Sequence, residues 1–133
     1  MTAQAVYGDV VEVTPIHFWM GNSGAFHVGL YLEGRPFDPT EDPAGEWVAR
    51  ADLVPQTGGE PVLTLHSAPS AGQGSFRFEP GRLVGEVTAA VMAAPVVPGR
   101  YGIEIELVDP EDGEPFVLAV GVVIVHEEGT QSA

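Results

Sequence analysis

The 133-residue sequence predicts an all-β protein that folds as a single antiparallel β-sandwich. Apolar and polar residues alternate with period two along most of the chain, and Gly, Pro or Asp interrupts the pattern about every ten residues. The 17 glycines and 12 prolines are too many for long helices and suit short strands joined by turns. The length fits one domain, which can bury a core without a metal or a disulfide.

We expect an N-terminal arm at residues 1–9, the sandwich domain at 10–126 and a polar tail at 127–133. The first strand begins at residue 10 and is interrupted by Pro15. Because proline cannot donate to a strand ladder, we expect this strand at an edge of its sheet.

Six further segments are expected to be strands, and Trp47 is expected to lie in the core. The clearest unit is a hairpin that joins residues 101–107 to 116–125. The other strands are expected at 26–32, 47–53, 62–67 and 75–79.

Two segments are less regular. Residues 83–92 carry alanines that favour a helix and valines that favour a strand, and we interpret them as a strand. Residues 33–45 contain three prolines and two glycines, so we expect the longest irregular connection of the chain there.

The segment 116–125 is apolar on both alternating sets of side chains. A strand of this kind is either covered on both faces or contacts a partner with one of them. We therefore take Val117 and Val123 as candidate interface residues.

Aromatic residues are densest at 18–20. On a strand, Phe18 points away from His17 and Trp19. Either His17 and Trp19 form a partner-facing patch on an edge strand, or curvature of the sheet buries both faces. With Tyr7 and Tyr31, these two residues complete the candidate interface.

No set of residues predicts catalysis, a cofactor or a metal. The chain has no Cys, and its four histidines fall on four different expected strands without zinc-like spacing. Acidic residues gather at 38–42 and 109–114, where a calcium site is conceivable, but neither loop has the EF-hand order of ligands, and we interpret both as solvated turns. The common hydrolase and nucleotide-binding motifs are also missing. We expect a protein that is not an enzyme.

The formal net charge of −14 argues against nucleic acid as a partner, because like charges repel a phosphate backbone. The acidity either serves solubility or matches a basic partner. The start of the chain is not a signal peptide, and no apolar run is long enough to cross a membrane, so we expect neither export nor membrane insertion.

Four segments give the chain a resemblance to small phage virion proteins with an immunoglobulin-like sandwich, including the N-terminal domain of baseplate upper proteins. They lie at 37–40, 47–51, 98–106 and 118–125. In these proteins a late hairpin of the form Gly-x-Tyr-x-Ile-Glu ends in Leu-x-Gly-x-Val-x-Val. Residues 99–104 match the first pattern, and 118–125 is similar to the second, with one extra residue between Leu118 and Gly121. The resemblance covers about residues 16–126, nearly the whole chain.

The resemblance implies a single immunoglobulin-like antiparallel β-sandwich of about seven to eight strands. It also implies a virion structural protein made in the host cytoplasm, present in many copies or as a homo-oligomer in the tail, baseplate or fibres, with other virion proteins as partners. A small β-domain of this kind would suit a capsid decoration or head-fibre protein equally well. A carbohydrate-binding module is the alternative from another class, with Tyr7, Trp19 and Tyr31 as its candidate platform.

Overall fold

The protein is all-β in a computed structural model, which describes residues 4–6, 11–12, 15–32, 35–41, 45–93 and 96–127. These residues form eleven strands and one short 3-10 turn, η1 (Pro39–Glu41). The strands are β1 (Gln4–Val6), β2 (Val11–Glu12), β3 (Ile16–Trp19), β4 (Gly24–Leu32), β5 (Arg35–Pro36), β6 (Val48–Pro55), β7 (Leu63–His66), β8 (Gly74–Glu79), β9 (Arg82–Val87), β10 (Gly99–Val108) and β11 (Pro115–His126).

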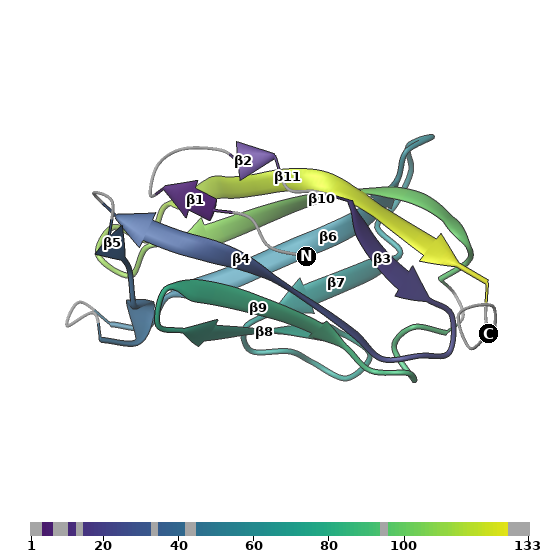
Figure 1. The fold of residues 1–133 in the computed structure, drawn as a ribbon, viewed down its shortest axis with the longest axis horizontal. Coiled ribbons are helices and arrows are strands. Elements are labelled where there is room, and N and C mark those ends of the chain that lie inside the picture. The colour runs from purple at the N-terminus through teal and green to yellow at the C-terminus, as the bar shows by residue number, and fades with distance from the viewer. Residues whose placement is uncertain are drawn as a thin grey trace.

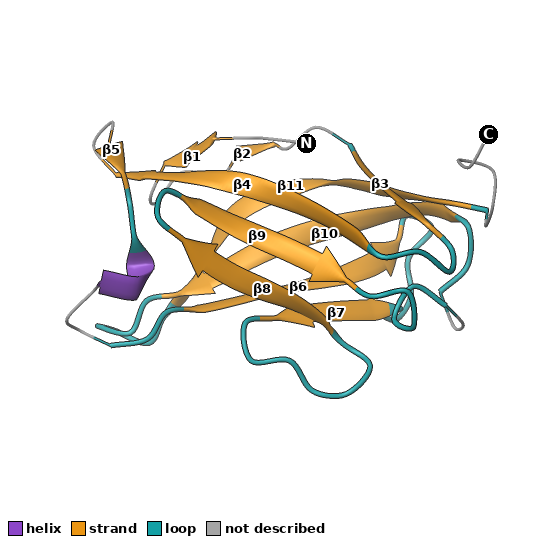
Figure 2. Ribbon diagram, turned by 60° about the horizontal axis from the view of Figure 1, so that its bottom comes forward, coloured by secondary structure: helices purple, strands orange, loops and turns teal. Residues whose placement is uncertain are grey.

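The strands belong to one hydrogen-bonded sheet that curls into a half-barrel. The pairing order is β1-β4-β9-β8-β7-β6-β10-β11-β2, with β5 on β4 and β3 on β11. Figure 1 shows β4, β9 and β8 nearer the viewer than β10, β6 and β7, and Figure 2 shows the curl of the sheet from another side. We call β1, β4, β5, β8 and β9 the front leaf, and the other strands the back leaf.

The sheet is mixed, whereas the sequence predicted antiparallel strands only. Four pairs are parallel: β1 with β4, β7 with β8, and both β2 and β3 with β11. The β7–β8 pair is short and marks where the chain passes from one leaf to the other, through residues 67–73. Parallel neighbours need a crossover instead of a tight hairpin, and these pairs arise where the chain changes leaves.

The β10–β11 hairpin confirms the clearest expectation from the sequence. Its register runs from Gly99 opposite Val125 to Val108 opposite Pro115, with a bulge after Ile105. Val123 lies opposite Tyr101 and is fully buried, while the alternate residues of β11 face outward and are half-buried. The two-sided apolar pattern therefore has one face in the core and one face partly open to solvent.

One hydrophobic cluster fills the space between the leaves. The ring of Phe26 on β4 lies 6.2 Å from that of Phe18 and 6.1 Å from that of Phe76. Trp47 is buried as predicted, and its ring contacts those of Phe37 and Phe116 edge-on. Each such side chain contributes about 1.5–3 kcal/mol by burial, so these rings hold the leaves together.

Two irregular segments differ from their expectations. The strand expected to reach residue 92 ends at Val87, and Met92 N–H donates instead to the Thr88 carbonyl at 3.0 Å, which closes one helical turn. The alanines of this segment favour that turn. The expected irregular connection contains η1 and the short strand β5.

Part of the expected N-terminal arm pairs within the sheet, because β1 runs alongside β4. The expected tail lies outside the described residues from position 128 onward.

The contact between Gly85 and Phe26 yields a stability prediction. A Cβ atom at Gly85 would lie 2.5 Å from two ring atoms of Phe26, which is itself fixed in the core. A Cβ atom at Gly102 would meet nothing closer than 3.9 Å. We expect Gly85→Ala to lower the free energy of unfolding by about 1–3 kcal/mol, and Gly102→Ala to change it by about 0.5 kcal/mol or less. Urea unfolding of both variants measures the difference, and equal effects would contradict this packing.

Candidate interaction site

The outward face of β3 carries the first part of the candidate site. Ile16 and Phe18 point into the core and are almost completely buried, so His17 and Trp19 point outward. His17 is exposed and Trp19 is partly exposed. Of the two interpretations of this segment, the outward-facing patch is therefore the one the structure contains.

The last strand supplies the third ring. Parallel pairing of β3 with β11 sets Trp19 opposite His126. The Trp19 and His126 rings stack with centroids 4.8 Å apart, and the His17 and His126 centroids are 5.1 Å apart. We call His17, Trp19 and His126 the aromatic patch.

A hydrogen bond joins the two histidines, with His17 Nδ1 and His126 Nε2 2.8 Å apart. One of these nitrogens must carry a proton and the other a lone pair, so the bond fixes the orientation of both rings. A metal ion does not fit between them, because each metal–nitrogen bond would take about 2.0–2.1 Å. Within the described part of the chain, no three His, Cys, Asp or Glu residues converge as metal ligands.

The edge position of β3 makes the patch accessible from the side. Among the described strands, β3 pairs with β11 alone, so it is an edge strand of the described sheet. An aromatic surface with polar ring nitrogens beside an open strand edge can bind another protein through both side chains and backbone.

The structure separates the other candidate residues from this patch. Tyr31 is partly buried opposite Pro36 at the C-terminal end of β4, whereas the turn after β3 leads into the N-terminal end of β4. Val117 is half-buried opposite Glu106, and Tyr7 lies outside the described residues. Val123 is buried in the core, which corrects its assignment to an interface, because the register turns its side chain inward.

His126 was missed as a member of the site. It is 109 residues from His17, and sequence spacing gives no signal across such a distance. Only the parallel pairing of an early strand with the last strand brings the two together.

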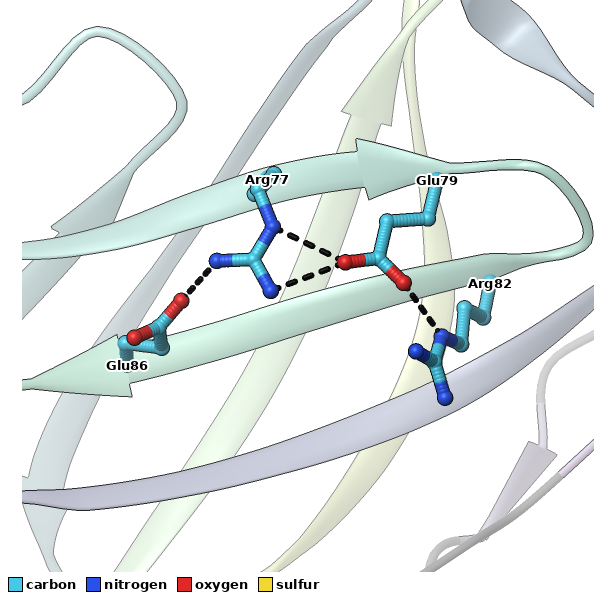
Figure 3. Close-up of polar contacts among 4 residues, drawn as sticks. All are labelled: Arg77, Glu79, Arg82 and Glu86. Atoms are coloured by element: carbon cyan, nitrogen blue, oxygen red, sulfur yellow. Dashed lines mark hydrogen bonds and ion pairs between the residues drawn. The ribbon is translucent and has the colours of Figure 1, made fainter.

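A second polar cluster lies on the outer face of the β8–β9 hairpin (Figure 3). Glu79 accepts hydrogen bonds from Arg77 Nε at 2.9 Å and from Arg82 Nε at 2.5 Å, and Arg77 also pairs with Glu86. The bonds from Arg77 and Arg82 lower the pKa of the Glu79 carboxyl, and the carboxylates of Glu79 and Glu86 raise the pKa of Arg77. The four side chains pair with one another, so we assign this cluster to holding the hairpin together.

Comparisons with known proteins do not assign the chain to a family. No protein-family model matches the sequence, and no curated protein is significantly similar to it. In the described residues, there is no helix with the length and apolar character to cross a membrane.

The ion pairs of Glu79 with Arg77 and Arg82 predict how the free energy of unfolding responds to acid. Because the folded-state pKa of Glu79 lies below its ordinary value of 4.5, its ion pairs stabilise the fold above that pH. This contribution is lost as the pH falls through the folded pKa. We expect Glu79→Gln to lower the free energy of unfolding near neutral pH and to match the wild type in acid. Glu111→Gln, on an exposed turn, is the control. A Glu79→Gln effect that stayed constant from neutral pH into acid would contradict the assignment.

Proposed function

We propose that this chain is a non-catalytic structural protein of a phage-type virion that binds neighbouring subunits through the aromatic patch on edge strand β3. The observation that carries the proposal is the gathering of His17, Trp19 and His126 on the outward side of an edge strand. Aromatic residues are enriched in the centres of protein interfaces, and an open strand edge accepts a further strand.

We further infer that the half-barrel is an immunoglobulin-like sandwich. The order β1-β4-β9-β8 corresponds to strands A, B, E and D of that fold, and β7-β6-β10-β11 corresponds to C′, C, F and G. The hydroxyl of Tyr101, near the start of β10, donates to the Val97 carbonyl at 2.5 Å. A tyrosine bonded to backbone just upstream at this corner is typical of the fold. The short β7–β8 pair then joins the edges of two sheets.

The virion assignment draws on the resemblance of residues 16–126 to small phage virion proteins. In such a particle, modest contacts repeated by symmetry add up to a stable ring or collar. A tail, baseplate or fibre position fits this mode of assembly, and a capsid decoration or head-fibre position uses the same contacts.

The carbohydrate-binding alternative has weaker support. Tyr31 lies at the C-terminal end of β4, whereas Trp19 ends β3 just before the N-terminal end of β4, so these two rings do not form one platform. One face of the Trp19 ring is also occupied by His126, which leaves a single face for a sugar.

Substitution in the patch tests the proposal. Trp19→Thr keeps a β-favouring residue on β3 and removes the largest ring of the patch. We expect co-sedimentation of the purified domain with particles from the source lysate to weaken by about 30-fold, as for loss of a central aromatic residue worth about 2 kcal/mol. Tyr31→Thr is the matched control and should sediment like the wild type. Equal behaviour of Trp19→Thr and the wild type would overturn the role of the patch.

Immunogold electron microscopy of the same particles tests the location. Gold at the distal tail supports a tail, baseplate or fibre component, and gold over the head supports a decoration or head-fibre protein. Unlabelled particles, in a lysate that contains the protein by immunoblot, would overturn the virion assignment.

A further inference from the structure

The outer face of the back leaf is hollowed between β7, β6, β10 and β11, away from the aromatic patch. The hollow has a volume of about 590 Å³. Gly102 lies at its floor because this residue faces outward and has no side chain, with Val54 opposite it on β6. Val120 adds an apolar wall from β11. With Asp52 and Glu104 on the rim, we call this set the acidic hollow.

Charge in the hollow is unbalanced at one cross-strand residue pair between β6 and β10. Arg50 lies opposite Glu106 and pairs with it at 2.9 Å. At the next outward-facing pair, Asp52 lies directly opposite Glu104, and both are exposed. Like charges opposite each other in a sheet are destabilising. Asp52 accepts a hydrogen bond from the Thr64 hydroxyl at 2.5 Å, which supplies no positive charge.

The chain offers few positive charges that could neutralise the carboxylates of Asp52 and Glu104. His66 lines the hollow, but its Nδ1 accepts the Ala68 N–H at 2.9 Å, so this nitrogen bonds to the backbone and not to the two carboxylates. The whole sequence contains five arginines and no lysine, and Arg50, Arg77 and Arg82 already pair with glutamates. With a net charge of −14, a second copy of the chain is a poor source of a cation for this surface.

We propose that the acidic hollow receives an arginine or lysine side chain from an extended basic segment of a different protein. The cationic head lies between the carboxylates of Asp52 and Glu104, and the aliphatic stem lies over Gly102 against Val54 and Val120. Long basic side chains bind in this way, with an apolar stem and a charged tip. The inference rests on the proposed assembly function for its setting, and it names the chemistry of one partner.

Binding of a model peptide tests the site in the intact chain. The probe is a short, end-blocked peptide of alternating arginine and valine, and its control has citrulline in place of arginine. Citrulline keeps the shape of the side chain and removes the charge. In a ¹⁵N NMR titration, we expect the arginine peptide to shift the amide signals of Asp52, Gly102, Glu104 and Val120, and the citrulline peptide to leave them in place.

Two double variants distinguish recognition at the hollow from general attraction to the acidic surface. Asp52→Asn with Glu104→Gln should weaken the peptide by about tenfold and should also raise the stability of the fold, since it removes the like-charge pair. Glu111→Gln with Glu114→Gln removes the same charge from the β10–β11 turn and should change affinity by about twofold or less. Equal weakening by the two double variants would show diffuse attraction and overturn the proposal.

A third variant tests the shape of the hollow. Gly102→Leu fills the floor while every charge stays in place, and the space above this residue is open enough for a side chain. We expect it to abolish the peptide-induced shifts. Unchanged binding by Gly102→Leu, or equal binding of the citrulline peptide, would also overturn the proposal. Because none of these changes touches β3, failure here is distinguishable from failure of the aromatic patch.

Discussion

The packing of Phe26 between Phe18 and Phe76 is the contact on which the rest of the structure depends. These three rings belong to β4, β3 and β8, so they tie an edge strand of the back leaf to the front leaf. Two glycines make the approach possible: a Cβ atom at Gly24 would lie 2.4 Å from the Phe18 ring, and one at Gly85 would strike Phe26. The inward position of Phe18 is also what turns His17 and Trp19 outward, so the core determines the site.

Basic side chains are few in this chain, and three of the five arginines form ion pairs with glutamates of the same chain. Arg77 and Arg82 stabilise the β8–β9 hairpin, and Arg50 joins β6 to β10. Exposed pairs of this kind contribute little individually. The remaining carboxylates give the surface a strong negative potential.

Much of the fold was predictable from local pattern. Alternation identified the strands around Phe26, Leu53, Leu65 and Ile105, and each of these residues is buried. The parallel pairs were not predictable, because alternation does not say which distant strand is a neighbour or in which direction it runs. The same limit applies to the site: the outward direction of Trp19 was one of two alternatives, and the contact with His126 depends on pairing across the whole chain.

The last strand connects the two surfaces. Outward residues of β11 run from Val120 at the acidic hollow through Val122 and Ile124 to His126 in the aromatic patch. The six steps along the strand from Val120 to His126 span about 20 Å. The outward side chains along this path are half-buried and apolar until the histidine. Under the two proposals, an extended partner laid along β11 would meet the acidic hollow, then an apolar middle, and then the aromatic patch. This order gives a physical reason for an apolar outer face on a strand whose inner face already fills the core.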